Sequence, residues 1–490
     1  MASNKKPNVI IIYADDLGYG DLSCYGAEDV KTPHVDALLE HGCRFDNTYS
    51  TSAVCTPARY SLLTGEYPFR NELTVILPGD SQCIIPEDKT TIADVFKRAD
   101  YRTAVVGKWH LGLSDGSIDW NDTVKHTPND LGFDYSFIFP ATNDRVPCVY
   151  MENSKVLNLD PSDPIQVSYG TECPFDTATT YYKNPEKLRM FSSHGHDNSI
   201  VNGVGRIGFM TGGTKALWRD EDLADRFLNQ VKEFALADEE EPFFVFYALH
   251  QPHVPRVPSE KFKGTSKLGV RGDVINELDY CVGELTKALD EKGILEDTII
   301  IFSSDNGPVL DDGYQDQSAK KNAAHRPAGP LRGGKYSKFD GGARVPFIVS
   351  WKGHMETSES DALLSQVDLM ASFASMLGVP LADDEAVDSY ALFDSFVGKS
   401  REERDMLVYE SMNKAQVLRS GKWAYLSPSA GAPIAWNTGN ELGNSLDPQL
   451  YNMQYDIGQR ANVTHDYAAI TKDMADKLQV IKESDHSFVR

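Results

Sequence analysis

Uninterrupted apolar runs, separated by helical patterns, constrain the fold of this chain more than any other feature. Residues 8–13 (NVIIIY) form the first run, which is typical of a strand buried on both faces of a sheet. Further runs occur at 103–106, 242–247 and 298–302, and helical patterns precede them at 91–96, 220–237 and 271–293. Strands that alternate with helices predict an α/β protein with a large, mixed but mostly parallel sheet flanked by helices.

The sequence changes in character after about residue 380. A polar spacer at 381–385 precedes short strand-like segments at 407–410, 415–418 and 423–426, and a helical pattern closes the chain at 467–483. We therefore expect a catalytic α/β domain at 1–394 and a smaller α+β subdomain with an antiparallel sheet at 395–490. The long, polar and irregular stretch from 114 to about 213 is expected to form loops that shape a pocket.

Polar side chains follow four of the predicted strands. They are Asp15 and Asp16, then Lys108 and His110, then His250 and His253, and finally Asp305 and Asn306. Lys108 and His110 are two positions apart, so on an extended chain their side chains are expected to point to the same face. Ligands of such sheets bind at the carboxyl ends of the strands. These four clusters therefore predict one functional site along that edge.

Asp15, Asp16, Asp305 and Asn306 supply only hard oxygen donors. This set suits Ca²⁺, or less well Mg²⁺, rather than zinc. Three converging carboxylates repel one another strongly unless a cation lies between them. The alternative is that each pair serves only as turn or cap residues, which is common for Asp and Asn.

The charge balance excludes several classes of partner. With 48 Lys and Arg against 72 Asp and Glu, the formal net charge is −24. Such a field repels nucleic acid and anionic membranes, so any anion site must be a local cluster of cations. No apolar run is long enough to span a bilayer. The chain starts abruptly without a secretory signal, so we expect a periplasmic or secreted protein whose leader has been removed, rather than a cytoplasmic one.

The segment Cys55-Thr56-Pro57-Ala58-Arg59 combines a thiol, a rigid proline and a permanent cation. Pro57 fixes φ and argues against a regular helix that runs on from Cys55. Arg59 has donors suited to an oxyanion. Taken alone, a cysteine such as Cys55 is usually a small buried core residue.

The same five residues resemble the C-x-P-x-R signature of the type I sulfatases, in the alkaline-phosphatase-like superfamily. Three further blocks are similar to those of the family, in the family's order: 107–112 (GKWHLG), 250–255 (HQPHVP) and 331–346, which contains LRGGK and GGARVP. The resemblance extends from residue 8 to about 350 and includes bacterial carbohydrate sulfatases and arylsulfatase A-like enzymes. It implies that a maturation enzyme converts Cys55 to formylglycine, whose hydrated aldehyde is the nucleophile.

The resemblance also implies a role for each matching residue. Asp15, Asp16, Asp305, Asn306 and an oxygen of the modified Cys55 would hold the metal ion. Arg59, Lys108 and Lys335 would bind sulfate, His253 would protonate the departing alcohol, and His110 would deprotonate the sulfated enzyme intermediate to release sulfate. Considered singly, a lysine is more often a solvated surface residue and a histidine a hydrogen-bonded structural one.

The predicted substrate is a sulfated carbohydrate, such as a hexose or N-acetylhexosamine sulfate of a glycosaminoglycan, mucin or algal glycan. The residues expected to bind it are Asn143, Asp144, Arg145, His194, His196 and Arg332, and residues 436–440 offer a further wall of the pocket. Two alternatives remain open. One is a phosphoester or phosphonate hydrolase of the same superfamily, and the other is a glycan-binding member in which Cys55 is never converted.

Overall fold

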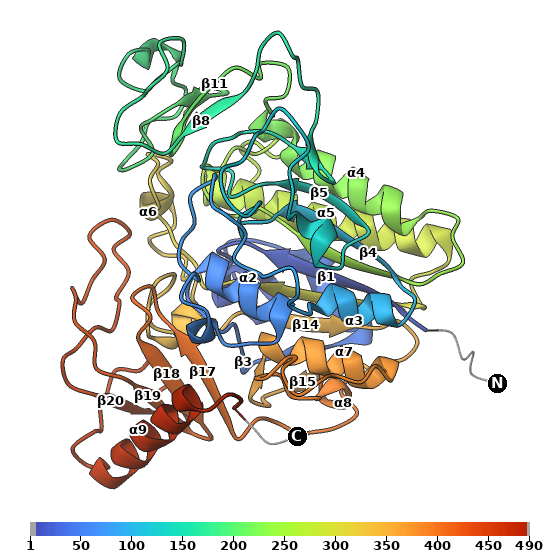
Figure 1. Ribbon diagram of the computed structural model, residues 1–490. Helices are drawn as coiled ribbons and strands as arrows, with labels where there is room; N and C mark the ends of the chain where they lie inside the picture. The colour runs from blue at the N-terminus through green and yellow to red at the C-terminus, as the bar shows by residue number, and fades with distance from the viewer. Residues whose placement is uncertain (1–5, 488–490) are drawn as a thin grey trace.

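The computed structural model describes residues 6–487. Residues 1–5, on which the expectation of a removed leader depends, lie outside this range. A ten-stranded mixed sheet forms the centre of the molecule (Figure 1). Across the sheet, the strands are β15 (Ser358–Ser360), β2 (Gly42–Phe45), β14 (Phe347–Ser350), β13 (Thr298–Ser304), β1 (Asn8–Ala14), β12 (Phe243–Ala248), β4 (Arg102–Lys108), β5 (Tyr135–Phe139), β6 (Met151–Glu152) and β7 (Lys155–Val156). Its middle strands, β13 to β5, run parallel, which confirms the predicted fold class.

Helices cover both faces of this sheet, as Figure 1 shows. Alternate residues of β1 enter two separate cores: Val9 and Ile11 pack on one face, and Ile10 and Ile12 on the other. The first face is covered by α2 (Cys55–Thr64), α3 (Ile92–Arg98), α7 (Leu369–Leu377) and α8 (Phe393–Phe396). The second is covered by α1 (Pro33–Ala37), α4 (Leu223–Ala235) and α5 (Val270–Lys292). The continuous apolar runs follow from this burial on both sides.

Smaller elements surround the main sheet. Three two-stranded pairs are β3 (Thr48–Tyr49) with β16 (Leu364–Ser365), β8 (Gln166–Ser168) with β11 (Phe209–Thr211), and β9 (Ile200–Val201) with β10 (Val204–Gly205), and a short helix, α6, covers Ser318–Lys321. Within residues 6–487, none of the helices combines the length and the apolar character needed to cross a membrane.

The C-terminal part contains the expected antiparallel sheet and terminal helix. Its strands are β17 (Met406–Glu410), β18 (Gln416–Ser420), β19 (Trp423–Leu426) and β20 (Gln449–Asn452), and the helix is α9 (Ala468–Glu483). The sequence reading missed β20. A domain boundary after residue 394 stays a prediction, and Phe396 and Val397 pack in the core of the large sheet.

Two local expectations were wrong. The stretch 114–213 is not irregular throughout, because β5 pairs in parallel with β4 inside the main sheet. In addition, α2 begins at Cys55 and includes Pro57. Proline is tolerated there because an N–H in the first turn of a helix has no intrahelical acceptor to lose.

The strand register places the polar clusters side by side. Ala14 of β1 pairs with Ser304 of β13, so Asp15 and Asp305 both follow at the same edge. On the other side of β1, Ala248 of β12 pairs with Gly107 of β4. The four predicted clusters therefore leave four adjacent parallel strands at their carboxyl ends.

Candidate active site

A cavity of about 220 Å³ lies beside these strand ends. Its lining includes eight of the residues singled out from the sequence: Cys55, His110, Asp144, Arg145, His194, His196, His253 and Lys335. Arg59 and Lys108 do not line it but lie fully buried beside the cavity residues. The structure thus brings together segments that are up to 280 residues apart, from Cys55 to Lys335.

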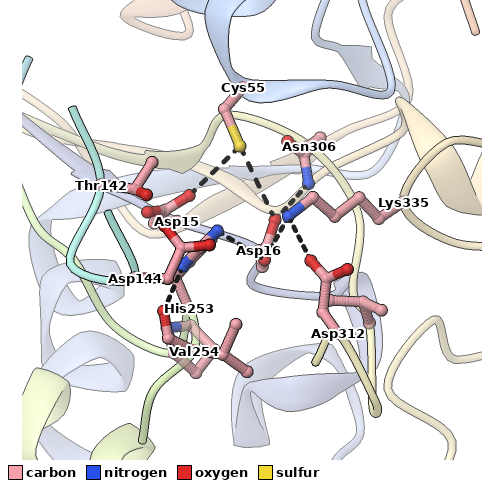
Figure 2. A network of polar contacts seen from close by, with 12 residues as sticks. Asp15, Asp16, Cys55, Thr142, Asp144, His253, Val254, Asn306, Asp312 and Lys335 are labelled. Carbon is pink, nitrogen blue, oxygen red and sulfur yellow. Dashed lines mark hydrogen bonds and ion pairs between the residues drawn. The ribbon is translucent and has the colours of Figure 1, made fainter. Parts of the chain in front are cut away.

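Cys55 lies directly against the predicted metal ligands. Its Sγ is 3.6 Å from Asp15 Oδ1 and 4.0 Å from Asp16 Oδ1 (Figure 2). Asp305 Oδ1 accepts a hydrogen bond of 3.2 Å from the backbone N–H of Asp16. One ligand atom from each of these four residues lies within 4.8 Å of the others, which is close enough to share one ion.

Three buried cations contact this acidic cluster. The contacts are Lys108 Nζ to both oxygens of Asp15 at 2.8 and 2.7 Å, Arg59 Nη2 to Asp305 Oδ2 at 2.8 Å, and Lys335 Nζ to Asp16 Oδ2 at 2.8 Å and to Asp312 Oδ2 at 2.9 Å. Four carboxylates therefore face three cations. A divalent cation together with a singly charged sulfate monoester would balance the charge.

Burial also affects the ionisation of these carboxylates. Burial raises the pKa of Asp15 to about 8 and also raises the pKa of Asp16. Burial acts on Asp305 in the same direction, but Arg59 and Lys108 outweigh it and hold the pKa of that carboxyl below its usual value.

Asn306 supplies a further observation that fits a metal ion. Its Nδ2 donates to Asp16 Oδ1 at 2.8 Å, but its buried Oδ1 has no hydrogen-bond partner among the described residues. A buried carbonyl oxygen without a partner is costly. Together with the carboxylates it completes a donor set that fits a hard divalent cation.

The two predicted acid–base histidines each keep one ring nitrogen available. His110 Nε2 donates to Leu77 O at 3.1 Å, and its buried Nδ1 has no partner among the described residues. His253 Nδ1 donates to Val254 O at 2.6 Å, which leaves Nε2 facing Asp16 Oδ2 at 3.7 Å. Burial and the nearby cations lower the pKa of both rings well below the usual value, which favours the neutral form.

One geometric expectation for this segment was wrong. The spacing of Lys108 and His110 predicts that they lie on one extended strand with their side chains on the same face. Instead, β4 ends at Lys108, and His110 has a φ of 57°. The chain therefore turns between the two residues, with Lys108 bound to Asp15 and His110 in the cavity wall.

Comparison with known proteins identifies the family. The family model described as Sulfatase matches residues 7–379, which is most of the chain. The chain belongs to the sulfatase family. As a member of it, the protein is a sulfuric ester hydrolase.

Individual relatives agree with this assignment. The chain is 46% identical to an N-acetylgalactosamine-6-O-sulfatase of Bacteroides thetaiotaomicron over 98% of this chain and 94% of the relative. Human arylsulfatase A is 28% identical over 99% of this chain and 88% of the relative. A solved structure from work on glycosaminoglycan metabolism in Bacteroides thetaiotaomicron, 46% identical, superimposes with a TM-score of 0.96 over 98% of this chain and 100% of its own.

On one wall of the sulfatase cavity, Asp144 joins two of the predicted substrate-binding residues. Its Oδ1 accepts from Arg145 Nη1 at 2.7 Å, and its Oδ2 accepts from His196 Nε2 at 2.9 Å. Burial opposes ionisation here, but Arg145 and the histidines hold the pKa of Asp144 well below its usual value. Asn143 is buried behind this wall, where its Nδ2 donates to Pro255 O at 3.3 Å.

Arg332 lies outside the cavity lining of the sulfatase. It forms an ion pair with Glu441, donates to the backbone oxygen of Gln459 at 2.8 Å, and stacks over Phe339. Its contacts therefore join the glycine-rich segment that precedes Lys335 to the C-terminal part of the chain.

The sequence reading missed two polar residues of the sulfatase cavity. Asp312 binds Lys335 Nζ, and the hydroxyl of Tyr336 lies 3.2 Å from both oxygens of Asp312. Tyr336 follows a predicted site residue directly and was a detectable candidate. Asp312 lies seven positions after Asp305 in a connecting segment and carries no local signal.

Proposed function

We propose that this sulfatase removes the 6-O-sulfate from N-acetylgalactosamine residues of a glycan, with formylglycine at position 55 as the nucleophile. The placement of Cys55 against Asp15 and Asp16, on the wall of a cavity that also contains His253 and Lys335, supports a nucleophile beside a metal-held sulfate. The 46% identity over nearly the whole length to an enzyme of that specificity supports the choice of sugar.

We propose Ca²⁺ as the ion held by Asp15, Asp16, Asp305 and Asn306, together with residue 55. The four side chains and a modified residue offer more oxygen ligands than Mg²⁺ ordinarily takes from a protein. When bound, the cation would draw negative charge from the sulfate oxygens and make sulfur more electrophilic.

The surrounding side chains have separate roles in the proposed reaction. Lys335 and Lys108 provide positive charge next to residue 55, and Arg59 holds Asp305. The free Nε2 of His253 is available to carry a proton to the departing alcohol, and a bound sulfate anion beside it favours the protonated ring. The free Nδ1 of His110 is available to accept a proton from residue 55. The hydrated aldehyde supplies one hydroxyl for attack on sulfur and a second that permits release of sulfate.

Conversion of Cys55 is proposed to require a maturation enzyme that acts before the chain has folded. Cys55 is only 3% exposed and begins helix α2. A folded chain would therefore give a modifying enzyme little access to the thiol.

The decisive experiment measures sulfate release from a matched set of substrates. N-acetylgalactosamine 6-sulfate is expected to be the preferred substrate over its 4-sulfate isomer and over N-acetylglucosamine 6-sulfate. Intact mass should show a decrease of about 18 Da from the unmodified chain, as expected when cysteine becomes formylglycine. Metal analysis should find calcium bound to the purified protein.

Controls separate the alternatives. Cys55→Ser should bind the sugar but lose turnover, because serine lacks the second hydroxyl. Full activity of this variant would overturn the formylglycine mechanism. Faster hydrolysis of the matching phosphate or phosphonate ester would favour the phosphoester alternative, and binding without turnover by an unmodified Cys55 would favour a glycan-binding protein.

A further inference from the structure

A hairpin from the C-terminal part of the chain forms one rim of the cavity. Residues 434–441, here called the rim hairpin, are closed by an antiparallel bridge between Ile434 and Glu441. The backbone N–H of Ala435 donates to Asn440 O at 2.8 Å. Asn437, near the tip, lines the same cavity as Cys55.

Several contacts fix the rim hairpin to the segment that carries Lys335. Asn440 Nδ2 donates to Lys335 O at 3.1 Å. Ser337 Oγ donates to Glu441 O at 2.6 Å, and Arg332 forms an ion pair with the Glu441 carboxylate. The hairpin is therefore held in place beside the candidate active site, and Arg332 contributes to holding it.

Trp436 precedes Asn437 and projects from this rim. Its side chain is among the most exposed of the large apolar ones described, with 86% of its surface accessible. Its ring contacts the ring of His194, which also lines the cavity, with centroids 5.4 Å apart and an interplanar angle of 60°. An edge-on contact of this kind leaves an indole face open beside the cavity mouth.

Most tryptophan side chains in folded proteins are largely buried, but that of Trp436 is not. Exposing an indole to water forgoes roughly 1.5–3 kcal/mol of transfer free energy, taking a large apolar side chain as the guide. A membrane is an unsuitable partner for the exposed ring because the chain carries a net charge of −24. A sugar ring presents an apolar C–H face that matches a flat aromatic surface.

We propose that Trp436 forms a second subsite, in which its indole face stacks against the sugar ring next to the sulfated residue. This inference rests on the proposed function, because it takes the sulfated sugar to lie in the cavity. The ligand is the neighbouring pyranose ring of the same glycan. The subsite favours a sulfated residue within a chain over the free monosaccharide.

The test compares two substrates and three variants. The substrates are N-acetylgalactosamine 6-sulfate and an oligosaccharide in which the same residue is linked to further sugars. Trp436→Ala should raise KM for the oligosaccharide about five- to tenfold, the range expected for loss of one aromatic contact, and change KM for the monosaccharide less than twofold. Trp436→Phe should retain most of the affinity.

Tyr455→Ala is the matched control, because Tyr455 is 81% exposed in the same part of the chain but lies outside the rim hairpin. It should leave both substrates unaffected. A binding measurement in a Cys55→Ala background removes the dependence on turnover: the oligosaccharide should bind more weakly when Trp436 is also replaced by alanine.

The outcomes distinguish the two hypotheses. Either of two results would overturn the subsite. One is that KM and affinity for the oligosaccharide are the same with and without Trp436, and the other is that Trp436→Ala weakens both substrates equally. Absence of sulfate release from either substrate by the unaltered enzyme would overturn the proposed function, while the binding measurement would still decide on the subsite. If Trp436→Ala instead loses binding of another protein and no sugar affinity, the exposed ring is a protein contact and the subsite is wrong.

Discussion

At the scale of single residues, Lys335 shows how the site accommodates buried charge. Its ammonium is 2.8 Å from Asp16 and 2.9 Å from Asp312. Burial alone would lower its pKa, but the two carboxylates outweigh this and raise the pKa of Lys335 well above its usual value. Asp312 therefore helps Asp16 to keep Lys335 charged, and the two carboxylates share its ammonium.

We expect Asp312→Asn to reduce kcat/KM about tenfold or more, mainly through KM. The substitution keeps the size of the side chain but removes a charged hydrogen bond, which is typically worth about 1.5–3 kcal/mol. Steady-state kinetics with the sugar sulfate measure the effect, and thermal unfolding verifies that the variant folds. Tyr336→Phe is the control, since it removes only the hydroxyl contact to Asp312, and a loss as large as that of Asp312→Asn would contradict a charge-based role.

At the scale of elements, strands β4 and β12 lie close together at Gly107, and this contact positions Lys108, the next residue. Gly107, the residue before it, has a φ of 112°, a region that side chains rarely adopt. A Cβ built at this position would lie 1.9 Å from Ala248 O on the neighbouring strand. Both the conformation and the interstrand space therefore require glycine here.

Gly107→Ala should destabilise the fold by about 3 kcal/mol or more, because backbone strain and overpacking each cost roughly 1–3 kcal/mol. Chemical denaturation measures the difference. Gly293→Ala separates the two causes: Gly293 has a φ of 77°, but a Cβ there meets nothing within 4 Å, so only about 1–2 kcal/mol should be lost. Equal losses at both positions would show that the contact with Ala248 is unimportant.

At the scale of the whole molecule, the sequence predicted the sheet far better than the connections around it. Uninterrupted apolar runs identify strands buried on both faces, and strands that end at one edge bring their following residues together, as for Asp15 and Asp305. The strand β5 was missed because it lies within a polar stretch. Asp312 and the contacts of Arg332 with Glu441 depend on segments that meet only in the folded chain, and no local pattern marks them.

The junction between the C-terminal sheet and the rest of the chain contains a further buried acid, Glu410. Glu410 ends β17, and its backbone pairs with Thr51 and Ala53, just before Cys55. Its side chain is 1% exposed, and neither carboxyl oxygen has a hydrogen-bond partner among the described residues. Burial raises the pKa of Glu410 to about 8, only partly offset by Lys414.

This carboxyl should make stability depend on pH. Between pH 4.5, the usual value for Glu, and about pH 8, the folded chain keeps the proton that the unfolded chain releases. Stability is therefore lost as pH rises through this window, by about 1.4 kcal/mol per pH unit.

Glu410→Gln removes the titration and keeps the shape of the protonated side chain. The variant should match the parent protein near pH 4.5 and become progressively more stable than it toward pH 8, as measured by denaturant unfolding at a series of pH values. Glu356→Gln, at an exposed position, is the control and should leave the pH profile unchanged. If the parent and Glu410→Gln keep a constant difference in unfolding free energy from pH 4.5 to 8, Glu410 is ionised in the folded junction, and a cation or water must satisfy its two oxygens.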